Sequence, residues 1–181
     1  MCTVKVLSAK WPRIAHPRKI EEMTAHRIRE AESADKDQLA AMMVSLWPDG
    51  TFEEFRQEAE ALIETQMCGT MPGTILVAAG NEGLLAGFIQ VGLRSHADGC
   101  DVAHAVGFVE GWFVQEDARG RGAGRDLMRA AEKWARAQGC AEMASDALIE
   151  NEDSQSAHSA LGFEMVDRCV HFRKPLKTDG D

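Results

Sequence analysis

Apolar and polar residues alternate along the chain with two different periods, one typical of helices and one typical of strands. After Asp35, apolar side chains recur every three or four residues, and Asp35 is a residue type that favours a helix start. The same period follows Thr51 and Gly122, and Gly139 supplies a typical helix end. We therefore expect four helices, at residues 35–47, 52–67, 122–138 and 151–160.

Short runs of apolar and β-branched residues, bounded by turn-forming residues, predict six strands. They cover residues 26–31, 74–79, 85–93, 105–114, 140–145 and 163–173, with a turn at 80–83. The second, third and fourth strands follow one another directly, whereas strands and helices alternate beyond residue 114. This order predicts an α+β fold in which helices flank a mixed central sheet.

The size and composition are those of one globular domain with short extensions. The chain has 181 residues, of which 45% are hydrophobic and 27% are charged. We expect the domain to span residues 23–176, between a disordered N-terminal extension at 1–22 and a tail at 177–181. The extension has five Lys or Arg residues against two Glu and lacks the apolar run of a signal peptide. A basic targeting arm is the alternative interpretation.

Net charge and cysteine content exclude several classes of protein. A formal charge of −9 argues against nucleic-acid binding, which requires a basic surface, and is compatible with a cationic partner. No apolar run reaches the roughly 18 residues of a membrane span, so we expect no membrane partner. The five cysteines are scattered without the spacing of a disulfide framework or a metal site. We therefore expect a cytoplasmic protein without a bound metal.

Residues 119–125 (Arg-Gly-Arg-Gly-Ala-Gly-Arg) join an apolar strand to an amphipathic helix. Glycines allow a ligand to approach the backbone, and the free N–H groups of a helix start bind anions. A Walker P-loop would require Lys after Gly124, and a dinucleotide-binding fingerprint that starts at Gly120 would require Gly in place of Arg125. The segment therefore predicts a pyrophosphate-binding cradle of another kind, with a flexible turn as the alternative.

Two motifs in this half of the chain resemble those of a known superfamily. Arg119-x-x-Gly122-x-Gly124 resembles the acetyl-CoA signature of the GNAT N-acetyltransferases, and Asn151 with the Leu-Gly-Phe at 161–163 resembles a second superfamily segment. Residues 45–48 (Ser-Leu-Trp-Pro), 109–114 (Val-Glu-Gly-Trp-Phe-Val) and 139–146 (Gly-Cys-Ala-Glu-Met-Ala-Ser-Asp) resemble the aminoglycoside 6′-N-acetyltransferases more narrowly. The resemblance runs from about residue 25 to 174 and excludes the N-terminal extension.

The resemblance implies that acetyl-CoA is the co-substrate and that the protein is a homodimer. The cradle would hold the pyrophosphate, and backbone N–H groups of strand 105–114 would hold the thioester and polarise its carbonyl group. The acetyl-CoA-binding residues implied in this way are Trp112, Phe113, Val114, Arg119, Gly120, Arg121, Gly122, Ala123, Gly124 and Asn151.

Three residues are candidates for the proton transfers of the reaction. Glu110 interrupts an apolar strand, where burial suits a carboxylate base; pairing with an arginine is the alternative. Asp146 closes strand 140–145, where the resemblance implies an acceptor-binding or proton-accepting aspartate; a turn cap is the alternative. His158 stands where the superfamily carries a tyrosine acid, and this chain has no tyrosine. Its imidazolium is a candidate acid, and a plain helix-face histidine is the alternative.

Further residues are expected to contact the acceptor together with Glu110 and Asp146. The resemblance implies that Trp47 packs against a sugar ring, with a core tryptophan as the alternative. It places Asp167 among the acidic contacts of the acceptor and His96 in a loop where the family has an aromatic or histidine contact.

The sequence leaves three functions open. They are 6′-N-acetylation of aminoglycosides, which confers antibiotic resistance, acetylation of another amine such as a polyamine or a protein N-terminus, and acyl-CoA sensing without catalysis. The carboxylates at 110, 146 and 167 favour a polycationic acceptor. No cysteine stands with a histidine in a nucleophile motif, so we expect direct transfer without an acyl-enzyme.

Overall fold

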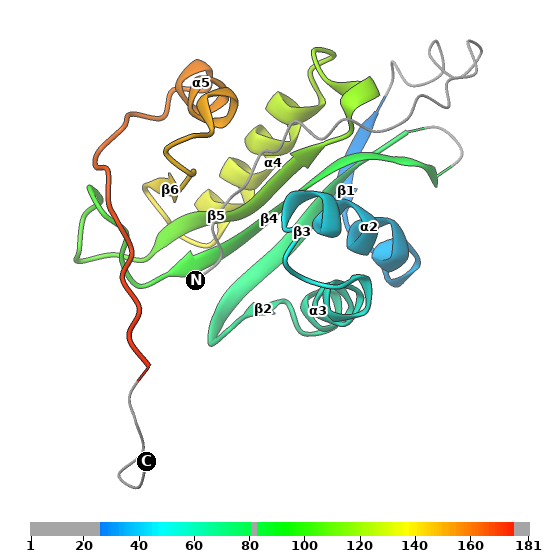
Figure 1. Ribbon diagram of the computed structural model, residues 1–181, viewed down its shortest axis with the longest axis horizontal. Coiled ribbons are helices and arrows are strands. Elements are labelled where there is room, and N and C mark those ends of the chain that lie inside the picture. Colours follow the sequence, from blue (N-terminus) through cyan, green and yellow to red (C-terminus); the bar gives the residue numbers. More distant parts are fainter. Residues whose placement is uncertain (1–25, 81–82, 176–181) are drawn as a thin grey trace, which may run out of the picture.

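Helices cover both faces of a six-stranded mixed sheet in the computed structural model, which describes residues 26–80 and 83–175 (Figure 1). The strands are β1 (Arg27–Glu30), β2 (Met67–Cys68), β3 (Met71–Ala79), β4 (Leu85–Arg94), β5 (Val106–Val114) and β6 (Met143–Ser145). The described α-helices are α2 (Lys36–Leu46), α3 (Phe52–Thr65), α4 (Ala123–Ala137) and α5 (Glu152–Ala160). The expected α+β fold is confirmed. The predicted extension at 1–22, the tail at 177–181 and the centre of the turn at 81–82 lie outside the described residues.

The strand order is β1-β3-β4-β5-β6, with β2 paired to the start of β3. All pairs are antiparallel except β5 and β6, which run parallel from Gly107 opposite Met143 to Val109 opposite Ser145. Beyond that last pair β5 continues to Val114, whereas β6 ends. The sheet therefore forks immediately after Val109 and Ser145.

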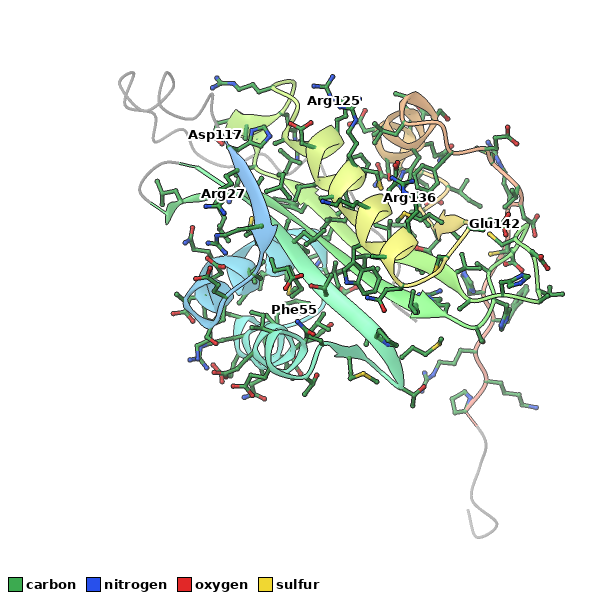
Figure 2. All side chains as sticks on the ribbon, turned by 180° about the vertical axis from the view of Figure 1, so that it is seen from behind. Arg27, Phe55, Asp117, Arg125, Arg136 and Glu142 are labelled. Carbon is green, nitrogen blue, oxygen red and sulfur yellow. The ribbon has the colours of Figure 1, made fainter. Side chains whose placement is uncertain are left out.

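The two faces of the sheet bury separate hydrophobic cores. On one face α2 and α3 pack against β-strand residues such as Ile75, Phe88 and Phe113. On the other face α4 packs against residues such as Ile89 and Trp112. Figure 2, seen from behind, shows α4 lying across this second face. The helical period predicted this arrangement, because α4 places its buried side chains on one stripe.

A β-bulge interrupts the pairing of β4 with β5. Gln90 lies opposite Gly111 and Val91 lies opposite Val109, so that Glu110 is the extra residue on β5. An extra residue bends the strand locally and redirects its side chains. The bulge therefore determines the direction of the Glu110 side chain.

Local capping interactions explain where two helices begin. Thr51 and Glu54 form a reciprocal capping box at the start of α3, as the residue types allow. Asp35 precedes α2 but makes no side-chain cap; its carboxylate instead accepts hydrogen bonds from the Arg29 guanidinium and from the Glu32 backbone N–H. Asp35 is thus the N-cap residue at the predicted start of α2, but its side chain does not cap that helix.

Besides shifts of one residue, the structure corrects the predicted elements in four places. The strand expected at 74–79 begins earlier, since β3 starts at Met71. The helix expected to reach residue 67 ends at Thr65, because Gln66 has a left-handed backbone with φ of 53° and is followed by β2. The strand expected at 140–145 is shortened to Met143–Ser145. Residues 163–173 form no strand. Val166 lies against Gly99 of the loop after β4, and the later part of the segment runs away from the body of the molecule (Figure 1).

We call residues 164–175 the C-terminal arm. Its apolar side chains are exposed: Val166 by 63%, Val170 by 71% and Phe172 by 94%. Apolar and β-branched residues there satisfy the local preference for a strand, but a strand also requires a neighbour for its hydrogen bonds. The arm has no such neighbour within the described part of one chain.

Candidate active site

The loop before α4 adopts a backbone that its glycines make possible. Gly120 and Gly122 have φ values of 72° and 93°, a region that other residues rarely adopt. Gly124 serves a different purpose, since a Cβ there would lie 3.0 Å from Cζ2 of Trp112 and would separate the helix from the sheet. Because Gly122 is the N-cap residue and provides no side-chain cap, the first N–H groups of α4 remain available.

Three arginines lie around these N–H groups, and one carboxylate, Asp126, stands in the first turn of α4, where its Oδ1 is 3.7 Å from Nε of Arg125. The side chains of Arg119, Arg121 and Arg125 are exposed, and Nε of Arg119 donates a hydrogen bond of 3.1 Å to the carbonyl oxygen of Val114. This hydrogen bond connects the glycine-rich loop before α4 to the end of β5. Figure 2 shows Arg125 at the start of α4. A helix N-terminus with flanking arginines attracts anions, so the arrangement suits a pyrophosphate group.

The fork between β5 and β6 lies beside this cradle. The side chains of Trp112 and Phe113 are buried in opposite cores, so these residues would contribute backbone groups rather than side chains to a ligand in the fork. On its other edge this part of β5 pairs with β4, with Phe113 opposite Phe88 and Val114 opposite Gly87. The pairing holds the fork edge of β5 in place.

Glu110 is buried and forms an ion pair with Arg94. Arg94 donates two hydrogen bonds to the carboxylate, 3.0 Å from Nε to Oε1 and 2.6 Å from Nη2 to Oε2. The guanidinium carbon of Arg94 also lies 3.3 Å from the centre of the Phe108 ring. The sequence did not single out Arg94, although a basic residue at the end of the strand beside a buried acid was an available signal.

Trp47 lies on the same face of the sheet as the bulge. A Cβ at Gly111 would lie 2.5 Å from Cη2 of Trp47, so the glycine provides the space that the indole occupies. The indole ring also packs on Phe55 and Phe88, with ring centres 5.7 and 6.5 Å apart. Trp47 is only half-buried, so part of the residue belongs to the core and part is exposed.

Asp146 and Asn151 lie on the short connection from β6 to α5. Asp146 is exposed immediately after Ser145, and its negative charge raises the pKa of His158. Asn151 is the N-cap of α5, and its Oδ1 accepts a hydrogen bond of 3.1 Å from the Ser154 N–H. The Asn151 side chain therefore caps the helix that the sequence predicts to start at this residue.

His158 is buried on α5 and not on an exposed helix face. Its ring lies edge-on to Trp112 and Phe163, with ring centres 5.4 and 5.2 Å apart. Burial lowers its pKa, against the smaller opposing effects of the Ser154 carbonyl and of Asp146. The neutral imidazole is therefore favoured near pH 7.

The two remaining predicted acceptor residues, His96 and Asp167, are both exposed. His96 is exposed and its Nδ1 hydrogen-bonds with the Ser95 hydroxyl at 3.1 Å. Asp167 is exposed on the C-terminal arm, and its Oδ1 accepts a hydrogen bond of 2.6 Å from the Arg168 N–H. Sequence reasoning missed Arg94 and also Ser145, whose hydroxyl hydrogen-bonds with His158.

Two negative findings concern the described residues only. Across residues 26–80 and 83–175, no three or more His, Cys, Asp or Glu side chains come close enough to hold a metal ion. Within the same ranges, no helix combines the length and apolar character that a membrane crossing requires.

The comparison with protein families identifies the fold. The model of the acetyltransferase (GNAT) family matches residues 36–163. The chain belongs to this family. Its most similar relatives include the aminoglycoside N(6′)-acetyltransferases type 1 of Klebsiella aerogenes and of Stenotrophomonas maltophilia. The first is 39% identical over 82% of this chain and 96% of the relative, and the second is 38% identical over 85% and 96%.

Solved structures of GNAT enzymes have the same architecture. AAC(6′)-Iy in complex with the bisubstrate analogue CoA-S-monomethyl-acetylneamine superposes with a TM-score of 0.74 at 30% identity, over 84% of this chain and 99% of that one. The aminoglycoside 6′-N-acetyltransferase AAC(6′)-Ih from Acinetobacter baumannii gives a TM-score of 0.74 at 29% identity, over 84% and 100%.

Proposed function

We propose that this GNAT protein transfers the acetyl group of acetyl-CoA to the 6′-amino group of aminoglycoside antibiotics and so confers resistance. The observation that carries the proposal is the combination of two sites at one fork of the sheet. An anion-binding helix start lies on one side, and a tryptophan with a buried carboxylate lies on the other. Named aminoglycoside N(6′)-acetyltransferases among the relatives support this substrate class.

Acetyl-CoA fits the cradle in its charge and shape. The N–H groups at the start of α4, with Arg119, Arg121 and Arg125, would bind the pyrophosphate. The backbone N–H groups of residues 112–114 would hold the thioester where β5 and β6 separate and would polarise its carbonyl group. A solved relative, AAC(6′)-Iy, binds CoA.

The acceptor would bind on the face that carries Trp47. Its amino sugar would pack on the exposed part of the indole, and Glu110 and Asp146 would attract its ammonium groups. One of these carboxylates would remove a proton from the 6′-ammonium group so that the free amine attacks the thioester directly. Asp146 is better placed for this role, because Arg94 already neutralises Glu110.

We also propose that the protein is a homodimer in which the C-terminal arm of one copy lies against the other copy. β6 is the last strand in the sheet order, and a groove of about 480 Å³ runs beside it. Its lining includes residues 98–100, 140–145 and 161–163, together with Glu164 and Val166 at the start of the chain's own arm. The arm offers what such an edge lacks, an extended backbone with exposed apolar side chains. Asp167 would reach an acceptor site only as part of that arrangement.

Three of the described cysteines, Cys100, Cys140 and Cys169, carry free thiols. Such thiols fit a reducing compartment, and we propose the cytoplasm as the site of action.

Acceptor choice is tested directly by the release of CoA thiol. The purified protein, with acetyl-CoA, should release thiol with kanamycin and tobramycin, and mass spectrometry with NMR should place the acetyl group on the 6′-nitrogen. Spermidine and a peptide with a free N-terminus form the comparison panel. If only the polyamine or the peptide is acetylated, aminoglycosides are not the acceptor and that amine takes their place in the proposal. If acetyl-CoA binds but no amine is acetylated, the result favours an acyl-CoA sensor.

A further inference from the structure

Ser145 and His158 form a hydrogen-bonded pair at the fork of the sheet. Oγ of Ser145 lies 2.9 Å from Nε2 of His158, and Nδ1 of His158 lies 2.8 Å from the carbonyl oxygen of Ser154. The imidazole is 8% exposed, whereas Ser145 is half-buried. Ser145 is therefore the more exposed member of the pair, and as the last residue of β6 it stands where the fork begins.

The carbonyl of Ser154 determines which nitrogen of the ring carries the proton. A carbonyl oxygen can only accept, so Nδ1 must donate to it. In the neutral ring Nε2 then has no proton and must accept the hydrogen bond of the Ser145 hydroxyl. This is the arrangement in which an imidazole polarises a hydroxyl group, as in enzymes where a histidine acts on a serine.

The position of Ser145 places the pair next to the expected chemistry. Ser145 is the last residue of β6 and pairs with Val109, and the next residue of β5 is Glu110. Asp146 follows Ser145 directly. The thioester that binds along residues 112–114 would therefore lie between the Ser145 hydroxyl and the acceptor carboxylates.

We propose that Ser145 and His158 form a proton relay from the attacking amine to the sulfur of CoA. This inference rests on the proposed acetyl transfer and deepens it, because it assigns the proton of the leaving thiol. In this relay the Ser145 hydroxyl would exchange protons with the amine and the sulfur, which makes Ser145 the catalytic residue of the pair. His158 acts through Ser145 and is a positioning residue.

The relay balances the transfer without an acyl-enzyme. A carboxylate first takes one proton from the ammonium group and releases it to solvent. The amine nitrogen then attacks the thioester carbon and becomes positively charged; its extra proton passes to Oγ of Ser145 while the Ser145 proton passes to Nε2 of His158. The C–S bond breaks with its electron pair on sulfur. The proton on Nε2 returns to Ser145 as Ser145 gives its own proton to sulfur, which leaves an amide, free CoA thiol and an unchanged pair.

The surroundings of the ring suit this cycle. Its resting state is neutral because burial lowers the pKa of His158, so Nε2 is free to accept a proton. Around the ring lie Ser154 of α5, Trp112 of β5, Phe163 after α5 and Ser145 of β6, all uncharged, while Asp146 supplies negative charge. Asp146 would stabilise the transient imidazolium.

Substitutions of the pair test the relay. Loss of a positioned proton-transfer group lowers turnover by roughly a hundredfold or more. We therefore expect Ser145→Ala and His158→Gln to lower kcat by about that factor, with the Kd of acetyl-CoA changed by less than about threefold. Ser145→Thr, which keeps a hydroxyl, should restore most of the turnover. Ser159→Ala is the matched control, because Ser159 is an exposed serine one residue beyond His158.

The pH profile separates the relay from a structural role. In the wild type, kcat should fall on the acid side as the imidazole of His158 takes up a proton, and this limb should be absent in His158→Gln. An unchanged acid limb in His158→Gln, or a Ser145→Ala variant that keeps at least half of the wild-type kcat, would overturn the relay.

The solvent isotope effect on the wild-type enzyme tests the relay even if a variant fails to fold. When chemistry limits the rate, kcat in mixtures of light and heavy water should depend on the deuterium fraction as a curve, because two protons move together. A linear dependence, or none, would overturn the relay. If the wild type acetylates a polyamine but no aminoglycoside, the proposed acceptor fails, and the relay is measured with that polyamine instead.

Discussion

Glu110 is a buried acid whose charge is already balanced in the structure. Arg94 binds both carboxylate oxygens, and the bulge aims the side chain at the face where Trp47 lies. Asp146, in contrast, is exposed one residue beyond the fork. Removal of the two charges should therefore affect the stability of the fold differently. Loss of the Glu110 charge would leave Arg94 without its partner, whereas the Asp146 side chain is not buried.

Neutral substitutions should separate the two acids. Asp146→Asn should lower kcat by about a hundredfold or more, as expected for loss of a base, and leave the thermal midpoint nearly unchanged. Glu110→Gln should lower kcat and also destabilise the fold by about 1–3 kcal/mol, because a partly buried guanidinium loses its partner. Adding Arg94→Met to Glu110→Gln should recover stability but not turnover. Wild-type turnover in both single variants would move the acceptor site elsewhere.

His158 should make the stability of the fold depend on pH. Because burial lowers the pKa of His158, the folded state binds its proton less well than the unfolded state, whose histidine titrates near 6.5. The stabilising contribution of neutral His158 to the free energy of unfolding is therefore fully present above about pH 6.5. It is lost as the pH falls toward the lowered pKa of the folded state. The unfolding free energy, measured by urea titration between pH 8 and 5, should decrease by at most about 1.4 kcal/mol per pH unit from this group. His158→Gln should have a shallower slope, and equal slopes would contradict the assignment.

At the scale of elements, α4 combines two functions in one helix. One stripe of α4 packs against the sheet, and its first turn presents N–H groups at the cradle. Two glycines with positive φ bound the helix, Gly122 at its start and Gly139 beyond its end. Only the first of these lies beside the proposed pyrophosphate site, which makes them a natural pair for comparison.

The cradle is tested by Gly122→Val with Gly139→Val as the matched control. Both positions have left-handed backbone, with φ of 93° and 88°, so each valine should destabilise the fold by roughly 1–2 kcal/mol or more. Only Gly122→Val should also weaken acetyl-CoA binding by calorimetry, by about tenfold, because its side chain enters the space beside the Arg125 guanidinium. Equal acetyl-CoA affinity in the two variants would argue against the cradle.

At the scale of the whole molecule, the arm and the open edge of β6 are complementary features of one chain. The arm carries unpaired backbone and exposed apolar side chains, and β6 ends the sheet order beside a groove. An isolated chain would leave both exposed to water. Two copies that exchange arms would cover both, which is why we expect the homodimer.

The dimer is tested by polar substitutions in the arm. Sedimentation should give twice the chain mass for the wild type, and the double variant Val170→Ser with Phe172→Ser should sediment as a monomer because the apolar contacts of the arm are lost. Leu84→Ser, at an exposed apolar residue just before β4, serves as the control and should remain dimeric. A monomeric wild type would refute the arrangement.

The sequence alone determined the features that depend on near neighbours in the chain. Helical and strand periods record which side chains face a core, and the positive φ values around α4 demand glycine at Gly120 and Gly122. The residue order 119–124 and the pattern around Asn151 were therefore sufficient to predict the glycine-rich loop before α4 and the start of α5. The order of elements was sufficient for a mixed sheet with helices on both faces.

The tertiary structure decided the features that depend on the pairing register of the strands and on residues far apart in the chain. The bulge that aims Glu110 arises only when β4 and β5 pair, and only that pairing brings Arg94 to the carboxylate. The contact of Ser145 with His158 likewise requires β6 and α5 to pack together. The arm was expected to be a strand from its local pattern, but a strand exists only where another backbone accepts and donates its hydrogen bonds, and no local pattern carries that information.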